Sequence, residues 1–391
     1  MTAPEKKKSR VVVAMSGGVD SSVAAGILKE QGHEVIGISL QLHDFAQKAP
    51  AQPEASKFGT CCSLEDLNDA RRVARKLDIP FYLSNMEAEF RKGVIENFVE
   101  EYAKGRTPNP CVRCNETVKF HTLMDWALDL GADYLATGHY AQIVERADGH
   151  ALVKGVDPEK DQSYFLFTLK QKDLARTLFP VGGMRKPEVR AMAEKLGLAT
   201  AMKPDSQDVC FVQSKSYTEF VETEAPKSWL KPGPVLDING KFLGQHTGLH
   251  RYTVGQRKGL GIQSLEAQFV IRLDATQNAV IVGPETALFR NECLAKEFNW
   301  LVDPATLSGR TLQGKIRYRA AGTPMTVTPR EDGLWDVKFE VPQRAITPGQ
   351  ALVLYDGDRV LGGGWIETPE TAHQPVHLAG RTPSPQAGIH A

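Results

Sequence analysis

The chain has 391 residues, of which 41% are hydrophobic and 24% are charged, and its 47 basic side chains balance its 47 acidic ones. This composition is typical of a globular protein, and the length predicts two or three domains. No apolar run is long enough to span a membrane, and the lysine-rich start leads into a short strand rather than a signal-peptide core. Six cysteines are too few for a disulfide scaffold at this length, so we expect reduced thiols and a cytoplasmic location.

The stretch Val11–Ser22 reads VVVAMSGGVDSS and predicts a strand, a tight turn and the start of a helix. Its apolar part, Val11–Met15, does not alternate, which is typical of a buried parallel strand. The glycines allow close approach of a ligand, and Ser21 and Ser22 lie where a helix N-terminus attracts an anion. SGGVDSS is neither a GxxxxGK[ST] nor a GxGxxG motif. It resembles the pyrophosphatase loop of enzymes that adenylate a carbonyl oxygen, which implies that it binds ATP and that Asp20 helps to hold Mg²⁺. A plain structural turn is the alternative.

The following elements alternate between strands and helices. Apolar periodicity predicts strands at His33–Leu40, Ile79–Leu83 and Tyr134–Thr137, and helices at Glu65–Leu77, Phe90–Tyr102, Glu116–Leu130 and Pro187–Leu196. This alternation predicts an α/β fold with a doubly wound parallel sheet, in which ligands bind at the carboxyl ends of the strands. Ser16–Asp20, Leu40 and Gly138–His139 all fall at those ends. The polar stretch Gln41–Gly59 is predicted to be a long loop.

Beyond about Phe220 the helical periodicity fades and short strands with Gly/Pro turns follow. Lys231–Ile262 and Phe269–Gly283 predict a small β-rich unit. Four further strands predict a small barrel, at Lys315–Arg319, Met325–Val327, Trp335–Phe339 and Ala351–Tyr355. We therefore divide the chain into an ATP-binding catalytic domain (1–220), a central β-rich domain (221–292), a C-terminal β-barrel (293–368) and a disordered tail (369–391).

Cys111 and Cys114 form a CxxC motif between a proline-rich loop and a predicted helix. A structural zinc site would need a second pair of ligands at short spacing, and none follows in the sequence. A thioredoxin-like pair would lie in a thioredoxin-type βαβ unit, whereas this domain opens with the predicted ATP loop. The third interpretation is a reactive thiol, because a helix N-terminus near Cys114 favours the thiolate. An inert buried thiol is the alternative for each of them.

Cys210 lies far along the chain, in a loop that could fold over the nucleotide site. Two distant thiols at one ATP site would permit sulfur transfer, in which one thiol carries a persulfide and the other releases the sulfur by thiol–disulfide exchange. Cys61, Cys62 and Cys293 have no such setting, and Cys293 is predicted to be a core residue.

Basic and aromatic side chains are interleaved in the second half of the chain. Between Lys227 and Ile262 six Lys/Arg residues stand against one Asp, with His246, His250 and Tyr252 among them. Lys315, Arg317, Tyr318 and Arg319 add a second group on one predicted strand. Basic groups bind phosphates and aromatic rings stack on unpaired bases, so this mixture favours RNA. A solvated charged face is the alternative.

Six motifs together resemble tRNA-specific 2-thiouridylases, over nearly the whole chain from Arg10 to about Ile366. They are AMSGGVDSS (14–22), TPNPCVRCNETVKF (107–120), ATGHYA (136–141), KDQSYFL (160–166), PDSQDVCFV (204–212) and HRYTVGQRKGLGI (250–262). The resemblance implies the three-domain fold and ATP-dependent 2-thiolation of the wobble uridine in tRNA of the Lys, Glu and Gln type. The C2 oxygen would be adenylated and then replaced by sulfur.

The resemblance also implies roles for individual residues. The ATP site would consist of Ala14, Met15, Ser16, Gly17, Gly18, Val19, Asp20, Ser21, Leu40 and Gly138. Cys210 would receive the persulfide sulfur, and Cys114 would be the partner nucleophile that forms a disulfide with it. The target base would contact Asn109, Pro110 and Cys111. Other tRNA contacts would come from His139, Lys160, Asp161, Gln162, Arg317, Tyr318 and Gln350.

Cys111 departs from other members of that family, which carry Asp at this position. Three thiolates, from Cys111, Cys114 and Cys210, would be enough to hold an iron–sulfur cluster. A cluster route therefore stays open beside the persulfide route, which we favour. The sulfur would come from a cysteine desulfurase or a sulfur-carrier protein. Two other classes stay open: a pyrophosphatase-loop ligase for a small metabolite, which leaves the thiols and the basic half without a role, and a non-enzymatic RNA-binding protein.

Overall fold

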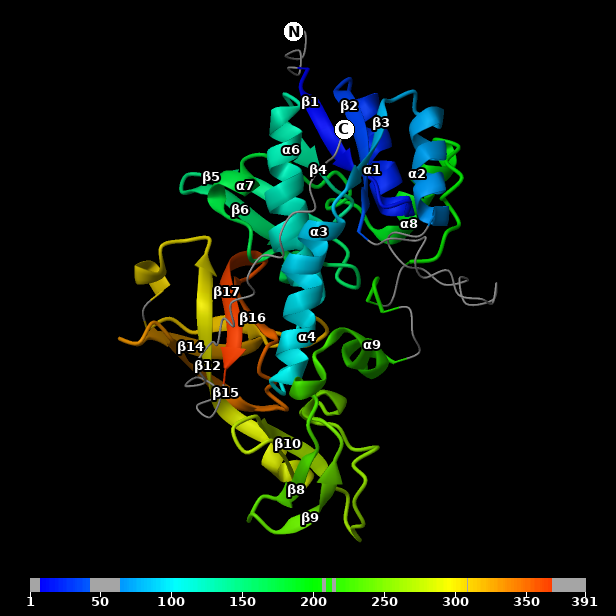
Figure 1. The fold of residues 1–391 in the computed structure, drawn as a ribbon. Helices are drawn as coiled ribbons and strands as arrows, with labels where there is room; N and C mark the ends of the chain where they lie inside the picture. The colour runs from blue at the N-terminus through cyan, green and yellow to red at the C-terminus, as the bar shows by residue number, and fades with distance from the viewer. Residues whose placement is uncertain (1–7, 43–63, 206–208, 213–215, 308, 368–391) are drawn as a thin grey trace, which may run out of the picture.

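The computed structural model describes residues 8–42, 64–205, 209–212, 216–307 and 309–367, whose strands form three sheets (Figure 1). Cys61, Cys62 and most of the predicted loop Gln41–Gly59 lie outside the described residues, as does the predicted tail 369–391. In the described part of the chain, no helix combines the length and apolarity needed to cross a membrane.

A five-stranded parallel sheet forms the N-terminal part of the molecule, in the order β3-β2-β1-β4-β7. Its strands are β1 (Arg10–Ala14), β2 (Glu34–Gln41), β3 (Phe81–Asn85), β4 (Tyr134–Ala136) and β7 (Thr177–Leu178). Successive side chains of a strand point to opposite faces, and Val12 lies in one buried cluster while Val11 and Val13 lie in another. Because both faces are covered, the sheet has the apolar strands of a parallel α/β sheet. The predicted α/β fold is confirmed.

Helices cover both faces of this sheet. On one face lie α1 (Val19–Glu30), α2 (Leu64–Lys76) and α8 (Lys186–Lys195). The other face carries a helical hairpin, whose first arm is α3 (Glu87–Phe90), a π-helix (Arg91–Ile95) and α4 (Glu96–Ala103), and whose second arm is α5 (Pro110–Arg113), a π-helix (Cys114–Thr122) and α6 (Leu123–Asp129). The arms approach closely at Gly93, where a Cβ would lie 2.5 Å from the Thr117 hydroxyl. Figure 1 shows the hairpin running from the parallel sheet toward the four-stranded sheet.

The second half of the chain is built from two β units, which follow the short helix α9 (Tyr217–Glu224). A four-stranded sheet has the order β10-β11-β8-β9, formed by β8 (Gly233–Asp237), β9 (Phe242–His246), β10 (Phe269–Asp274) and β11 (Ala279–Gly283). The last unit closes into a barrel because β12 pairs with both β15 and β17. Its strands are β12 (Phe289–Trp300), β13 (Leu312–Lys315), β14 (Thr323–Pro329), β15 (Trp335–Arg344), β16 (Ala351–Asp356) and β17 (Arg359–Glu367). The predicted β-rich unit and barrel are confirmed.

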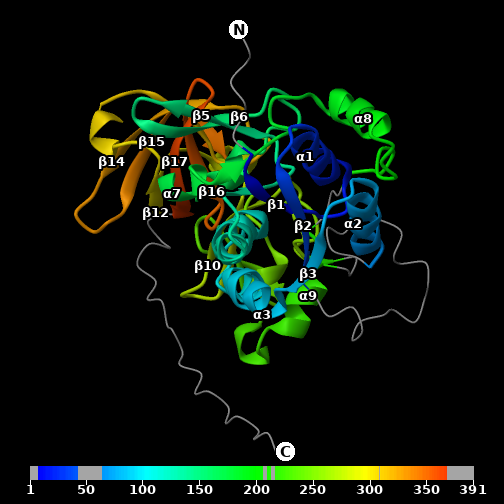
Figure 2. The same cartoon turned by 90° about the horizontal axis from the view of Figure 1, so that it is seen from above.

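A hairpin that the sequence analysis did not predict connects the parallel sheet with the barrel. Strands β5 (Ala141–Arg146) and β6 (Gly149–Lys154) follow β4 in the chain, yet β6 pairs with β17 at Val153↔Arg359. The hairpin therefore extends the barrel sheet although it leaves the parallel sheet directly. Figure 2 shows the barrel and the parallel sheet side by side, with β5 and β6 along the barrel.

The predicted strand Lys315–Arg319 is wrong, because β13 ends at Lys315. The chain then turns, and the ring of Tyr318 packs against Phe165, with ring centroids 4.5 Å apart. This contact with the N-terminal part draws the segment away from the barrel ladder, so its basic and aromatic residues lie on a turn.

The predicted division of the chain at 220/221 and 292/293 stays a prediction. The first boundary falls within α9 and the second within β12.

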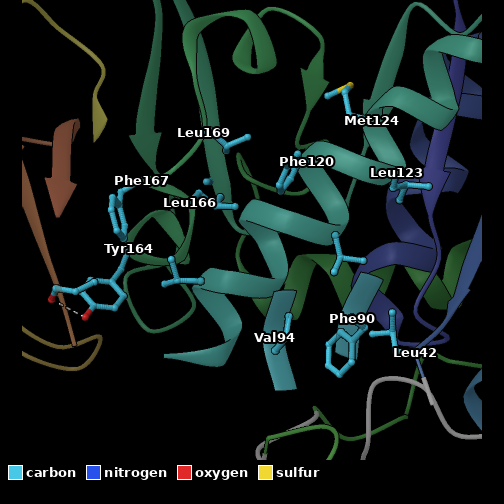
Figure 3. Packing of buried hydrophobic residues seen from close by; sticks show 14 of the residues in the cluster. Leu42, Phe90, Val94, Phe120, Leu123, Met124, Tyr164, Leu166, Phe167 and Leu169 are labelled. Atoms are coloured by element: carbon cyan, nitrogen blue, oxygen red, sulfur yellow. Dashed lines mark hydrogen bonds between the residues drawn. The ribbon is translucent and has the colours of Figure 1, made fainter. Parts of the chain in front are cut away.

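One apolar cluster is shared by the parallel-sheet part and the barrel. It contains Val12 and Phe90 from the first and Ala351 and Trp365 from the second. Figure 3 shows how its members run from Leu42 and Phe90 to the rings of the 164–167 segment. Because the core is continuous, the barrel and the sheet hold each other in a fixed arrangement.

A buried ion pair joins the same two parts. The Arg106 side chain is 7% exposed and its partner Glu367, at the end of β17, is 1% exposed. Arg106 also pairs with Glu101 at 2.6 Å, and Lys296 lies 2.9 Å from Glu367. Burial raises the pKa of Glu367, but the hydrogen bond and charge of Arg106 outweigh this, so the pKa lies below its ordinary value.

Arg106→Met is expected to lower the free energy of unfolding by about 3 kcal/mol, because the buried Glu367 carboxylate then loses the guanidinium that pairs with it. Denaturant unfolding of the purified protein measures this. The loss should shrink as the pH falls through the pKa of Glu367, below its ordinary 4.5, since a protonated carboxyl no longer needs the guanidinium. The matched control is Arg310→Met in the exposed Arg310–Asp356 pair at 2.8 Å, expected to change stability by less than about 0.5 kcal/mol. Equal losses in the two variants would contradict the prediction.

Candidate active site

The predicted nucleotide loop follows β1, at the point where the order of the strands in the sheet reverses. β1 lies between β2 and β4, so the strand order reverses there, and ligands of such sheets bind at the carboxyl ends of the strands at this point. Helix α1 starts at Val19, which places Asp20 and Ser21 in its first turn. The hydroxyls of Ser21 and Ser22 donate to the Gly18 carbonyl at 3.3 and 2.7 Å. These bonds fix the turn that presents the helix N-terminus to an anion.

Two glycines of the predicted ATP site are required by close contacts. Gly17 has a φ of +74°, and a Cβ there would lie 2.0 Å from the Asp66 carbonyl oxygen. A Cβ on Gly138, after β4, would lie 2.5 Å from the Ser21 nitrogen. The structure thus brings Gly138 to the loop Ser16–Ser21, as predicted from their places at strand ends. Leu40 is half-buried on β2 and packs against the same cluster as Val12.

A cluster of opposite charges lies at this loop. The Lys186 ammonium, at the start of α8, is 2.8 Å from Asp20 Oδ1 and 2.6 Å from Asp205 Oδ1. Lys160 donates to Asp205 Oδ2 at 2.7 Å, and the Tyr140 hydroxyl donates to Asp20 Oδ1 at 2.7 Å. The Lys186 side chain is only 10% exposed. Asp20, predicted to hold Mg²⁺, is therefore paired with an ammonium group.

The pKa shifts in this charged cluster follow from its geometry. Burial raises the pKa of Asp205, but hydrogen bonds from Lys160 and Lys186 outweigh it, so the pKa lies below the ordinary value. The hydrogen bond to Asp205 raises the pKa of Lys160. Burial and then the Asp20 charge raise the pKa of Tyr140, so its hydroxyl stays a donor. Asp205 and Lys160 are thus both in their charged forms at neutral pH.

Lys160, Asp161 and Gln162, predicted to contact tRNA, lie beside this cluster. The Asp161 carboxylate accepts the Gly155 and Ser163 N–H groups at 3.1 Å each. Gln162 Oε1 accepts the Tyr140 N–H at 3.0 Å. These bonds tie the segment to Tyr140, just before β5, and to Gly155, just after β6.

His139 lies between aromatic rings at the same edge of the sheet. Its ring centroid is 6.0 Å from those of Phe120 and Phe179, and its Nδ1 is 2.7 Å from the Thr137 hydroxyl. Burial, and then the charge of Lys119, hold the pKa of His139 well below its ordinary value. At neutral pH the imidazole is uncharged, so it offers stacking area and hydrogen bonds rather than a positive charge.

The proline-rich loop that carries the predicted target-base residues is held from the barrel. Gln350, directly before β16, donates to the carbonyls of Thr107 and Pro108 at 3.0 and 3.1 Å. Asn109 accepts the Val112 N–H at 3.3 Å as the N-cap of α5, and Pro110 is the first helical residue. Gln350 was predicted to contact tRNA, and the structure uses its amide to hold this loop.

The helical surroundings of Cys111 and Cys114 differ from the expectation. The helix was predicted from Glu116, but it begins at Pro110, so Cys114 lies in its second turn and Cys111, which is exposed, in its first. The favourable field of a helix N-terminus falls off within one turn and therefore acts at Cys111. Cys114 instead opens a π-helix, a form frequent at functional sites.

Cys114 and Cys210 are both half-buried and pack against the same apolar cluster. The Cys210 segment is anchored by Phe211, which makes edge-on ring contacts with Phe90 and Phe98 at 5.7 and 5.0 Å. Within the described residues, no three His, Cys, Asp or Glu side chains are grouped so as to hold a metal ion. Cys293 is buried in the barrel, and burial raises its pKa to about 12, which confirms the predicted core thiol.

Arg317 and Tyr318 face the N-terminal part from the turn after β13. Arg317 donates to the Arg344 carbonyl, and burial, then the charge of Arg344, lowers its pKa. The Tyr318 ring lies beside Phe165. Tyr318 thus lies on the side of the barrel that meets the N-terminal part, and Arg317, its neighbour in the same turn, bonds to the end of β15.

The sequence analysis did not single out Lys186, Asp205 or Tyr140. One signal was available: Lys186 is a basic residue in the first turn of α8, where the helix macrodipole is unfavourable for a cation. A residue that opposes a local preference is a candidate for function. Its partners could not be read from the pattern, since Asp20 lies 166 positions earlier.

The sheet, the glycine loop at its switch point and the adjacent cations define a nucleotide-binding protein of the pyrophosphatase-loop class. Family models match the chain in three segments: the tRNA methyl transferase HUP domain at residues 9–214, the tRNA methyl transferase PRC-barrel domain at 218–284 and the aminomethyltransferase beta-barrel domain at 290–366.

Two relatives are similar over nearly the whole chain. The tRNA-specific 2-thiouridylase MnmA of Geotalea uraniireducens is 54% identical over 362 residues, which are 92% of this chain and 96% of that protein. The MnmA of Geobacter metallireducens is 52% identical over 370 residues, which are 94% and 99%. The chain belongs to the MnmA family of tRNA-specific 2-thiouridylases. Solved structures resemble it distantly: NMN synthetase from Francisella tularensis has a TM-score of 0.31 and 16% identity over 57% of this chain and 80% of that one.

Proposed function

We propose that this protein uses ATP to replace the C2 oxygen of the wobble uridine in tRNA by sulfur. The family supports the reaction, and one observation of the structure supports the way it is divided: the nucleotide loop with Asp20 and Lys186 lies in the unit that also carries Cys114 and Cys210. Activation by ATP and sulfur transfer can then act on one bound base. The proposal includes the cytoplasm as its location, where thiols stay reduced.

In the first step the C2 oxygen attacks the α-phosphorus of ATP, and pyrophosphate leaves. The N-terminus of α1 and the loop Ser16–Ser21 bind the phosphates. Mg²⁺ usually binds one or two carboxylates together with substrate phosphates, and the Asp20 carboxylate in the first turn of α1 fits that donor set. When bound there, Mg²⁺ would neutralise charge on the leaving pyrophosphate.

In the second step the terminal sulfur of a persulfide on Cys210 attacks C2 of the adenylated uridine, and AMP leaves with the bonding electrons of the C–O bond. The Cys114 thiolate then attacks the Cys210 sulfur, which forms a Cys114–Cys210 disulfide and releases 2-thiouridine. A thiol reductant restores both thiols. The persulfide sulfur comes from a cysteine desulfurase or a sulfur-carrier protein.

We assign the target base to the loop of Asn109, Pro110 and Cys111, which leads directly to Cys114. The N-cap bond of Asn109 and the hydrogen bond from Gln350 hold this loop in place. His139, Arg317 and Tyr318 would contact the tRNA around it. Uncharged His139 and Tyr318 offer rings for stacking, and Arg317 offers positive charge. Lys160, which the resemblance assigns to tRNA, donates to Asp205 beside the nucleotide loop.

Pyrophosphate release from ATP, measured with and without unmodified tRNA, tests the activity. We expect release that depends on tRNA and, after a sulfide source is added, a mass gain of the wobble nucleoside that matches exchange of oxygen for sulfur. Release without tRNA would favour a ligase for a small metabolite. Binding of tRNA without any release would favour a non-enzymatic RNA-binding protein.

A second measurement separates the persulfide route from a cluster held by Cys111, Cys114 and Cys210. The protein is purified without oxygen and assayed for iron, labile sulfide and thiolation. We expect thiolation by iron-free protein that is supplied with persulfide. Activity that requires stoichiometric iron would contradict the persulfide route.

A further inference from the structure

The contacts of Asp205 are those of a phosphate group. Its two carboxylate oxygens each receive a different lysine, Oδ1 from Lys186 at 2.6 Å and Oδ2 from Lys160 at 2.7 Å. Arg190 lies 3.6 Å from Oδ1. Two oxygens of one anion, each bound by a cation, are also how a phosphate is held by lysines.

This group of cations lies at the nucleotide loop. Lys186 contacts Asp20 at 2.8 Å, and Asp20 is in the first turn of α1. The loop itself contains no lysine or arginine between Ser16 and Ser22. A triphosphate needs cations when it leaves water, and a helix N-terminus supplies only about half a positive charge. Lys186 and Lys160 reach the loop from elsewhere in the chain to supply that charge.

The burial of Lys186 favours an anion at its ammonium group. Its side chain is 10% exposed, so water alone cannot solvate the ammonium, and an unpaired charge at such depth is costly. Asp205 is itself about one quarter exposed, with a side-chain value of 26%. It can therefore leave the lysines and be solvated, whereas the buried Lys186 keeps Asp20 at 2.8 Å and can take a phosphate in the place of Asp205.

We propose that Lys160 and Lys186 bind the two phosphate groups of ATP that leave as pyrophosphate, and that Asp205 occupies both lysines when no nucleotide is bound. This inference rests on the proposed function for the identity of the nucleotide only, since no step with tRNA or sulfur enters it. Asp205 is then a competitor of the phosphates, and its removal favours nucleotide binding.

The test measures the binding of ATP, pyrophosphate and AMP to the full chain by calorimetry, without tRNA. Lys186→Gln is expected to weaken ATP and pyrophosphate binding roughly 10- to 100-fold, and Lys160→Gln, which is more exposed, about tenfold. Asp205→Asn is expected to tighten both about three- to tenfold, because it removes the competing charge. Binding of AMP, which lacks the two leaving phosphates, should change less than about twofold in all three variants.

Matched controls on the exposed side of α8 are Lys195→Gln and Glu194→Gln, which remove the same charges away from the loop. Neither should change any of the three affinities, and thermal unfolding shows that each variant is folded. Should Lys186→Gln unfold, Lys160→Gln and Asp205→Asn still give opposite signs. A purely structural ion cluster predicts instead that Asp205→Asn weakens ATP and AMP alike, and this result would overturn the inference. A protein that binds ATP with the expected pattern but does not thiolate tRNA would contradict the proposed function and leave this inference standing.

Discussion

Cys210→Ser is expected to lower thiolation of tRNA by at least about 10³-fold while tRNA-dependent pyrophosphate release continues. The hydroxyl of serine cannot carry a persulfide, whereas adenylation uses the loop at α1 and needs no sulfur. Half-buried Cys210 lies beside the anchored ring of Phe211, and Ser is close to Cys in size, so the segment should keep its place. Mass analysis of the wobble nucleoside and a pyrophosphate assay on the same samples measure the two steps separately.

The matched control for the loss of a thiol is Cys293→Ala. This cysteine is buried in the barrel, among residues such as Leu312 and Met325 of that core, far from the nucleotide loop in the fold. Its replacement should leave both steps unchanged. Full thiolation by the Cys210→Ser protein would show that another group carries the sulfur, and the persulfide assignment would then be wrong.

The sheet and its ligand edge could be predicted from the sequence because each step is local. β1 is a run of valines without alternation, and both faces of it are indeed buried. The turn glycines follow it directly, and Gly138 follows β4 in the same way. Strand ends in a parallel sheet meet at one edge, so the topology brings them together once the strands are recognised.

The parts that could not be predicted depend on contacts between distant residues. The strand β6 pairs with β17 through a single residue pair, Val153 and Arg359, and no pattern in either strand names its partner. Lys186 reaches Asp20 across 166 positions. Gln350 fits a tRNA contact by resemblance, yet its amide donates to two backbone carbonyls of the 107–110 loop. Such roles follow from tertiary packing, which propensity and periodicity do not encode.

The continuous core has a consequence for catalysis. Gln350 donates to the loop that precedes Cys114, and Glu367 pairs with Arg106 near the start of that loop. Both residues belong to the barrel part of the chain. Because one continuous cluster packs against both parts, a shift of the barrel would move the loop to which we assign the target base relative to the proposed nucleotide loop. We therefore expect the barrel to act as part of the scaffold of the proposed site.

Asp20→Ala is expected to reduce tRNA-dependent pyrophosphate release about 100-fold or more, because the site loses the carboxylate that would hold Mg²⁺ on the phosphates. Loading of persulfide on Cys210 needs no nucleotide and should be unchanged. Asp20→Ala thus loses the adenylation step and keeps the sulfur-loading step, whereas Cys210→Ser keeps adenylation and loses sulfur transfer. Asp358→Ala is the matched control: this carboxylate is 77% exposed beside Lys154, and its loss should leave both steps intact.

Asp20 and Asp205 both bind Lys186, yet their removal should have opposite effects. If Asp20 served only as a counter-ion of Lys186, Asp20→Ala would free the ammonium for phosphate and tighten ATP binding, as Asp205→Asn is expected to do. If Asp20 instead takes the metal once Lys186 moves to the phosphates, ATP binding in the presence of Mg²⁺ should weaken in Asp20→Ala. Normal pyrophosphate release by that variant would contradict the metal-binding role of Asp20, and with it the interpretation of the loop as a pyrophosphatase site.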